Sequence, residues 1–227
     1  MNNSSLVTYT KISPNKTIPR NKTVDRITPH CVVGHCTVET LGDIFHPTSR
    51  KASSNYGIDD NGKVGMYVEE KDRSWCSSSS DNDNRAITIE IASDKTEPYA
   101  MSETAYNKFI ELCVDICKRY NKTKLLWITD KEKALAYKPK DNEMLLTVHR
   151  WFANKSCPGN WLYNRLGEVA ETVTKKLVVN ETTETKPETR TLYCVQVGAF
   201  SKKQNAINLQ TKLKSLGFDT YITTKNV

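Results

Sequence analysis

The run Ala86-Ile87-Thr88-Ile89-Glu90-Ile91-Ala92 places an isoleucine at every second position from 87 to 91. Because side chains alternate between the two faces of a strand, the isoleucines share one face and Glu90 projects from the other. The segment 102–120 follows, with apolar residues at the helical period and Ser102 available as its N-cap. A core strand that precedes a long amphipathic helix predicts an α/β domain.

More strands and helices are expected on both sides of this pair. Asn61-Gly62 is a strong hairpin signal between two short apolar segments, which predicts one antiparallel pair of strands. The other expected elements are strands at 27–33, 125–128 and 145–148 and helices at 38–45 and 160–177. We therefore predict a mixed central β-sheet flanked by helices, formed by residues 24–177 and preceded by a polar arm at 1–23.

A second, smaller module is expected after this domain. Residues 178–190 are a Thr/Glu/Lys run without periodicity, which is the composition of a solvated linker. Residues 191–227 then predict a β-α-β unit, with strands at 193–197 and 218–223 around a helix at 203–216. The pattern therefore predicts two domains joined by a linker.

Composition limits the class of protein. The chain has 227 residues and a net charge of +7, but the cations are mixed with acids along the chain, so a polyanionic cell wall explains this balance as well as a nucleic acid would. We expect no nucleic acid as partner. No apolar run approaches the roughly 18 residues of a membrane span, and the N-terminus lacks the apolar core of a secretory signal. The seven cysteines show no framework spacing, so most are expected to be reduced. We expect synthesis in the cytoplasm without a signal peptide.

The segment 147–159, T-V-H-R-W-F-A-N-K-S-C-P-G, carries the residues of a candidate metal site. His149 offers an imidazole and Cys157 a thiolate, and these ligands suit zinc better than calcium or magnesium. The third ligand is expected from His30, at the end of an apolar run that predicts a core strand. Three protein ligands leave the fourth tetrahedral position for water, which distinguishes a hydrolytic zinc site from a structural one.

Each candidate residue also has an ordinary structural interpretation. A single histidine is more often a polar or core residue than a ligand, and His35 and His46 are interpreted in this way. Glu90 is either a solvent-facing strand carboxylate or a base that takes a proton from the attacking water. Lys155 is either a solvated loop lysine or a cation beside an oxyanion, and Tyr56 is either a half-buried strand residue or a donor to that oxyanion.

Together these motifs resemble the type 2 N-acetylmuramoyl-L-alanine amidases, the zinc family that includes phage-lysozyme amidases and peptidoglycan recognition proteins. The resemblance covers residues 25–177. The ligand positions of the family are matched by His30-Cys31, His149 and Cys157-Pro158-Gly159. The lysine two residues before the third ligand, the tyrosine of the first hairpin and the Glu-bearing strand are matched by Lys155, Tyr56 and Ile87–Glu90.

This resemblance implies a cofactor and a reaction. It implies that His30, His149 and Cys157 hold Zn²⁺, and that the protein hydrolyses the amide between the N-acetylmuramic lactyl group and the L-alanine of the stem peptide. Non-catalytic members typically lack the third ligand, so Cys157 favours an enzyme over the alternative of a peptidoglycan-binding recognition module. A zinc peptidase that cuts within the stem peptide is a weaker alternative.

The resemblance also assigns roles to other residues. It implies that Glu90 acts as base and then as acid, and that Lys155 and Tyr56 stabilise the oxyanion. Trp75 is expected to line the substrate groove. Cys76 follows it where relatives often have Trp-His, so no substrate-contacting histidine is expected there.

The C-terminal residues 193–200 resemble the opening of a SPOR domain, a family that binds the glycan strands of peptidoglycan. Only the first half of such a module is visible up to Val227. Because a two-stranded fragment has unpaired edges, either the module is cut short or it completes its sheet with another copy, which gives a possible homo-oligomer. A lytic activity without a signal implies a phage endolysin or a bacterial autolysin that acts on the cell wall after release.

Overall fold

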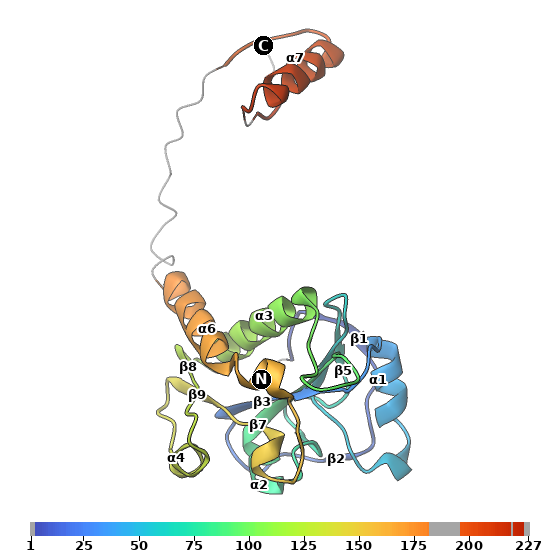
Figure 1. The fold of residues 1–227 in the computed structure, drawn as a ribbon, viewed down its shortest axis with the longest axis vertical. Coiled ribbons are helices and arrows are strands. Elements are labelled where there is room, and N and C mark those ends of the chain that lie inside the picture. The colour runs from blue at the N-terminus through green and yellow to red at the C-terminus, as the bar shows by residue number, and fades with distance from the viewer. Residues whose placement is uncertain (1–2, 182–195, 219, 225–227) are drawn as a thin grey trace. The chain divides into compact units, whose positions relative to one another are not determined.

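The computed structural model describes residues 3–181, 196–218 and 220–224 (Figure 1). Its main feature is a seven-stranded sheet in the order β1-β5-β4-β7-β3-β9-β8. The strands are β1 (Val7–Thr10), β3 (Arg26–Cys31), β4 (Tyr56–Ile58), β5 (Val64–Met66), β7 (Ala86–Ile91), β8 (Lys124–Leu126) and β9 (Glu143–Leu146). In this sheet β4 and β5 pair antiparallel, and the other neighbours pair parallel. The predicted mixed sheet is therefore confirmed.

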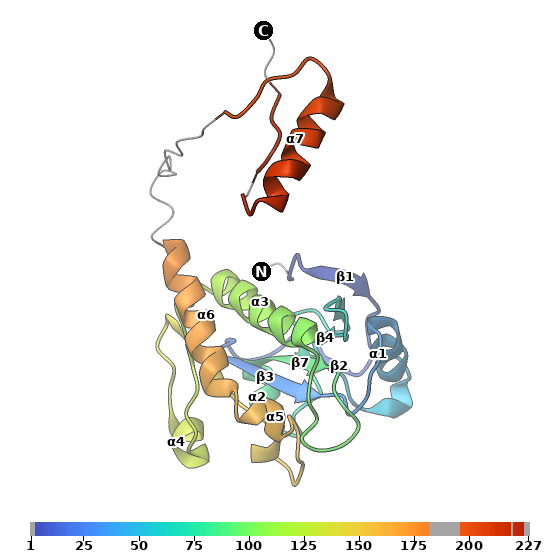
Figure 2. The same ribbon diagram turned by 45° about the horizontal axis from the view of Figure 1, so that its top comes forward.

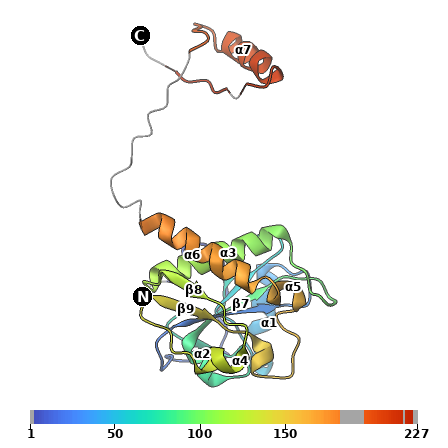
Figure 3. The ribbon, with the colours of Figure 1, turned by 60° about the vertical axis from the view of Figure 1, so that its left-hand side comes forward.

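Helices cover both faces of the sheet. They are α1 (Val38–Phe45), α2 (Ser80–Arg85), α3 (Glu103–Arg119), α4 (Lys131–Ala136), α5 (Asn160–Tyr163) and α6 (Leu166–Glu181), with the 3-10 helices η1 (Thr48–Arg50) and η2 (His149–Trp151). The long helices α3 and α6 lie side by side over one face, and α2 lies over the other (Figures 1 and 3). A separate two-stranded sheet pairs β2 (Lys16–Thr17) with β6 (Arg73–Ser74).

The central strands β3 and β7 lie in the middle of the sheet, below α3 in the view of Figure 2. One of their faces is apolar and the other is polar. Ile87, Ile89 and Ile91 are fully buried in one cluster with the apolar residues of α3 and α6. The register aligns His30 of β3 with Glu90 of β7, so these two side chains share the opposite face. The predicted partition of this strand, with isoleucines on one side and Glu90 on the other, is confirmed.

The polar face is held by hydrogen bonds between buried side chains. Thr28 Oγ1 lies 2.8 Å from Thr147 Oγ1, and Asn82 Nδ2 of α2 donates to Thr28 Oγ1 at 3.0 Å. Thr88 Oγ1 lies 2.7 Å from Ser74 Oγ of β6. Because buried polar groups need partners, this network fixes α2 and β6 against the sheet and shapes the floor beside Glu90.

Several elements differ from the sequence prediction. The predicted arm at 1–23 contributes β1 to the edge of the sheet, where it pairs with β5. The predicted helix at 160–177 is divided into α5 and α6, and the guanidinium of Arg165, at the break, donates to the carbonyl oxygen of Trp161 at 2.8 Å. That bond satisfies a carbonyl near the end of α5 that the interrupted helix leaves without an internal partner.

Residues 185–227 form a second compact unit apart from residues 1–184. Its helix α7 (Lys203–Ser215) lies within the predicted span of 203–216. The predicted strand at 218–223 is wrong, because the residues that the structure describes there have no regular secondary structure. The predicted strand at 193–197 lies mostly outside the described residues. The predicted linker also lies largely outside them. None of the helices in the described residues is long and apolar enough to cross a membrane.

Candidate active site

Three segments that are distant in sequence bring the predicted zinc ligands together. His30 lies near the end of β3, His149 begins η2 just after the neighbouring β9, and Cys157 lies in the loop that follows. The backbone N–H of Arg150 donates to the carbonyl oxygen of Cys157 at 3.1 Å, which folds this loop back toward η2. The possible ligand atoms of His30, His149 and Cys157 all lie within 4.8 Å of one another.

The spacing and chemistry of these atoms fit a zinc ion. His30 Nδ1 lies 3.3 Å from Cys157 Sγ. Tetrahedral zinc, with bonds of about 2.0 Å to nitrogen and 2.3 Å to sulfur, sets these two atoms about 3.5 Å apart. Burial, with a smaller effect of His149, lowers the pKa of His30 to about 3, so its ring is neutral as a metal ligand must be. Two imidazoles and one thiolate are a donor set that zinc prefers.

Glu90 lies beside this ligand set. Its strand neighbour in the register is His30, and the thiol of Cys76 donates to Glu90 Oε1 at 3.8 Å. Desolvation by the surrounding protein raises the pKa of the Glu90 carboxyl to about 8, although one side of the residue remains open to solvent. A carboxyl group with a pKa near neutrality can both accept and return a proton.

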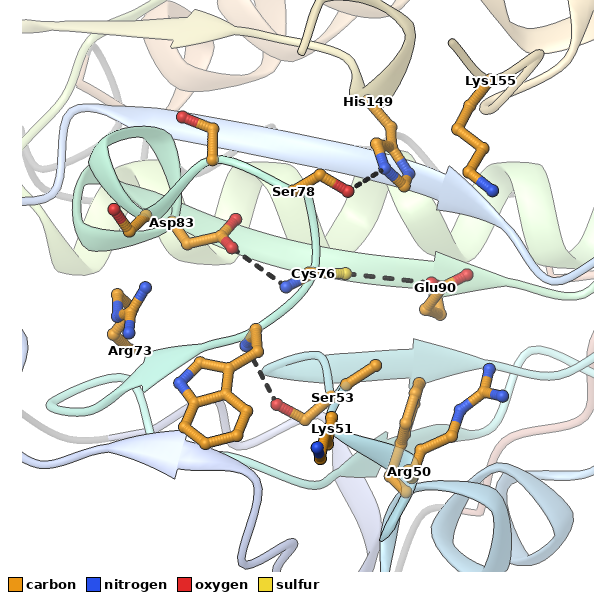
Figure 4. Close-up of a pocket in the computed structure, with 15 residues that line it drawn as sticks. Arg50, Lys51, Ser53, Arg73, Cys76, Ser78, Asp83, Glu90, His149 and Lys155 are labelled. Carbon is orange, nitrogen blue, oxygen red and sulfur yellow. Dashed lines mark hydrogen bonds between the residues drawn. The ribbon is translucent and has the colours of Figure 1, made fainter. Parts of the chain in front are cut away.

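The polar face opens into a pocket of about 500 Å³ that Glu90, His149, Lys155 and Trp75 line together (Figure 4). Figure 4 shows Lys155 beside His149, on the loop that leads to Cys157. The Trp75 indole N–H donates to Thr17 Oγ1 at 2.9 Å, which fixes the ring at the pocket wall. The structure therefore brings six of the seven predicted site residues to one place, and these are His30, Glu90, His149, Cys157, Lys155 and Trp75.

Cations dominate the charge of this pocket. Arg50, Lys51, Arg73 and Lys155 line it, against the acids Glu90 and Asp83. Asp83 of α2 already accepts hydrogen bonds from Cys76 and Ser77 in the loop before the helix. The pocket therefore presents an excess of positive charge to a ligand, which favours substrates that carry carboxylates.

Sequence reasoning missed the polar residues that follow Trp75 and Cys76, from Ser77 to Asp83. Ser78 Oγ lies 2.9 Å from His149 Nε2, which leaves Nδ1 of that ring for a metal. Asp83 Oδ2 accepts from the backbone N–H of Cys76 at 3.0 Å, and Asp83 Oδ1 accepts from the hydroxyl of Ser77 at 2.6 Å. In the sequence this stretch is a run of serine, aspartate and asparagine, a composition typical of a solvated loop.

Tyr56 is the predicted site residue that the structure places elsewhere. Its strand pairs it with Ile89, so the fully buried phenol lies on the face that α3 and α6 cover, opposite Glu90. Its hydroxyl donates to Glu70 Oε1 at 2.6 Å and accepts from the backbone N–H of Ser4 at 2.9 Å. Tyr56 therefore does not reach the pocket, and we do not carry its predicted oxyanion role forward.

Replacing Tyr56 with phenylalanine tests this placement. We expect the free energy of unfolding to fall by about 1–3 kcal/mol, because Glu70 and Ser4 each lose a buried partner. The kcat of the hydrolytic reaction that the sequence predicts should stay within about twofold of the wild type, because loss of an oxyanion donor would lower it by about 10²-fold or more. Chemical denaturation measures the stability and initial rates measure kcat. A large loss of kcat in a stable variant would show that Tyr56 takes part in catalysis.

Comparison with known families agrees with this geometry. Residues 21–160 match the family model described as N-acetylmuramoyl-L-alanine amidase. Because the match covers more than half of the chain, the protein belongs to this family. Residues 189–227 match the SPOR domain model, in agreement with the resemblance of the C-terminal sequence. Among the curated proteins searched, none matches this sequence.

Solved structures share the fold at low sequence identity. A mutant of PlyL superposes with a TM-score of 0.53 and 16% identity, over 73% of this chain and 96% of the other. A mutant endolysin from Bacillus subtilis superposes with a TM-score of 0.52 and 13% identity, over 73% of this chain and 97% of the other. The Staphylococcus aureus hydrolase AmiA in complex with its ligand superposes with a TM-score of 0.52 and 12% identity, over 77% of this chain and 84% of the other. At these identities the likeness concerns the fold alone.

Proposed function

We propose that this protein is a zinc-dependent peptidoglycan hydrolase that cleaves the amide bond between N-acetylmuramic acid and the L-alanine of the stem peptide. The observation that carries the proposal is the convergence of His30, His149 and Cys157 around one possible ion position, beside Glu90 and an open pocket. Membership of the amidase family supports the reaction class. The cationic lining of the pocket fits a stem peptide, which carries free carboxylates.

The ligands and Glu90 have separate tasks in this reaction. His30, His149 and Cys157 would hold the zinc ion, which would supply a Lewis acid for the scissile carbonyl and the attacking water. Glu90 takes the proton from the attacking water as the new C–O bond forms. It then returns that proton to the amide nitrogen as the C–N bond breaks, so that L-alanine leaves as an amine.

Lys155 has an electrostatic task. It is exposed at the rim of the pocket on the loop before Cys157, and its charge contributes to the lowered pKa of His149, after burial as the main cause. A cation in this position stabilises the negative charge that develops on the carbonyl oxygen during attack. Trp75 is proposed to hold the substrate along the pocket wall, since its ring is fixed by Thr17.

The proposal includes a cellular role. The SPOR match supports binding of the C-terminal segment to glycan strands, which would keep the catalytic domain near its substrate. The amidase match and the SPOR match both concern peptidoglycan, so we propose that the protein acts on the bacterial cell wall as a phage endolysin or as an autolysin.

Metal removal tests the zinc dependence. Purified peptidoglycan should release soluble peptides with zinc-loaded protein, and the rate should fall by about 10³-fold or more after chelation, because the Lewis acid is lost. Zinc added back after removal of the chelator should restore the rate, whereas magnesium or calcium should not, since the donor set is nitrogen and sulfur. Undiminished release by metal-free protein would contradict the proposal.

A further inference from the structure

A second group of possible metal ligands lies next to the first. The possible ligand atoms of His30, Cys76 and Glu90 all lie within 4.8 Å of one another. They come from β3, from the loop after β6 and from β7, and Figure 4 shows the Cys76 thiol directed at Glu90. The proposed reaction uses Glu90 and His30 but gives Cys76 no task, so this group is not explained by it.

The loop holds the Cys76 thiol in place. Asp83 accepts hydrogen bonds from the backbone N–H groups of both Cys76 and Ser77, at 3.0 and 3.1 Å. The Asp83 side chain is itself buried, so it has little freedom to move away from these donors. A ligand that the fold already positions loses little conformational freedom when an ion binds, so the sulfur is preorganised beside Glu90.

The His30 ring can contribute to both groups. Its Nδ1 faces Cys157 Sγ, whereas Nε2 is buried and has no hydrogen-bond partner within the described residues. The side chain is almost entirely buried, with the residue 1% exposed. A buried polar nitrogen without a partner is rare in folded proteins and points to a ligand that is still to be supplied.

The donor types select the kind of ion. Cys76 would bind as a thiolate and Glu90 as a carboxylate, so their two charges balance a divalent cation in a poorly solvated position. Sulfur and imidazole nitrogen favour zinc or cadmium over magnesium or calcium. This second position therefore suits a soft divalent cation.

We propose that Cys76, Glu90 and Nε2 of His30 form a second, weaker site for a soft divalent cation, which fills when the metal is in excess and inhibits the hydrolase. The inhibition rests on the proposed function, because an ion on the Glu90 carboxylate blocks its proton transfer. Binding displaces the thiol proton of Cys76 and the ring proton of His30 to solvent. The second ion shares the His30 ring with the first, and repulsion between two neighbouring cations makes this site the weaker one.

Metal stoichiometry of the full chain tests the site without reference to activity. After equilibration with excess Zn²⁺ and removal of free metal by rapid gel filtration, the wild type should hold about two zinc ions and Cys76→Ser about one, because a hydroxyl is a poor ligand for zinc. Glu90→Gln, which keeps the shape of the side chain, should also hold about one. Cys36→Ser is the matched control, since it removes another half-exposed thiol from outside the pocket and should still hold two.

Cadmium provides a spectroscopic readout of the same site. Cadmium–thiolate bonds absorb in the ultraviolet, so titration of the wild type with Cd²⁺ should show two steps and Cys76→Ser one. Two steps in Cys76→Ser, or a single bound ion in the wild type at excess metal, would overturn the proposal. The same would follow if Cys36→Ser, and not Cys76→Ser, lost the second ion.

The inhibition is measured separately. Excess Zn²⁺ should inhibit the wild type, and half-inhibition of Cys76→Ser should need at least about tenfold more zinc, relative to the uninhibited rate of each protein. Equal sensitivity of the two proteins would overturn the inhibitory role. A protein that binds two ions but releases no peptide from peptidoglycan would instead contradict the proposed function. The measured metal content would then still support the second site.

Discussion

Replacing Glu90 with glutamine is expected to lower kcat for peptidoglycan cleavage by about 10²- to 10⁴-fold, the usual contribution of a positioned acid–base group. Glutamine has nearly the same shape as glutamate but cannot accept the proton of the attacking water. Because Glu90 is not in the primary ligand set, the tightly bound equivalent of zinc should remain. KM should change little, since the carboxylate acts on the reacting atoms.

The measurement pairs initial rates on solubilised muramoyl peptides with zinc analysis of the same preparation. Glu103→Gln is the matched control, because Glu103 is an exposed residue in the first turn of α3, away from the pocket. It should keep the wild-type kcat. If kcat of Glu90→Gln stayed within about threefold of the wild type, Glu90 would have no acid–base role and would be an ordinary strand carboxylate.

Replacing His30 with alanine is expected to remove both zinc and activity. His30 is the ligand shared by both candidate donor groups, and its Nδ1 lies 3.3 Å from the Cys157 sulfur. Without it, two ligands remain, which is too few for a tightly held catalytic zinc. We expect the zinc content to fall to a small fraction of one ion per chain, and the rate of wall hydrolysis to fall by about 10³-fold or more.

His35→Ala is the matched control for this variant. His35 is exposed, and its two ring nitrogens lie 3.1 Å from carboxylate oxygens of Asp60 and Asp94, away from the pocket. It should keep zinc and activity. Because loss of a buried ring can also destabilise the fold, thermal unfolding is compared with and without chelator. The chelator should lower the melting temperature of the wild type but not of His30→Ala. Wild-type zinc content and lytic activity in His30→Ala would refute the ligand assignment.

The fold could be predicted largely from local patterns. The alternation around Glu90 identified the central strand and its faces, and the period of 102–120 identified α3 with its Ser102 cap, whose Oγ accepts from the Ala105 N–H at 3.1 Å. Short edge elements such as β1 were missed, because a strand of 4 residues with alternating burial depends on pairing with β5 and has little signal of its own. The break between α5 and α6 was missed because the apolar period continues across it.

The site could be predicted only in part, since its parts come from distant segments. His30, His149 and Cys157 could be grouped by their donor types and by family resemblance, but spacing along the chain does not show that β3 and β9 are neighbours. Tyr56 was misplaced for a related reason. Its face depends on the register of β4 with β7, which pairs it with Ile89, and no pattern within β4 specifies that register.

Ser78 and Asp83 were missed for a different reason. Ser78 and Asp83 lie in a polar run, and their tasks arise only because α2 packs against the sheet and turns this loop toward His149. Hydrogen bonds of this kind are set by tertiary packing and leave no periodic trace in the sequence. Cys76 was visible in the sequence as a departure from related chains, but its position beside Glu90 required the structure.

The most direct test of the account is the chemical identity of the ends that the zinc-loaded protein creates in purified peptidoglycan. Labelling of new amino termini, followed by mass spectrometry of the released peptides, identifies the bond that is cut. The account predicts intact stem peptides that begin with a new N-terminal alanine and carry no sugar. Peptides that remain attached to muramic acid, or that begin at a residue within the stem, would contradict it.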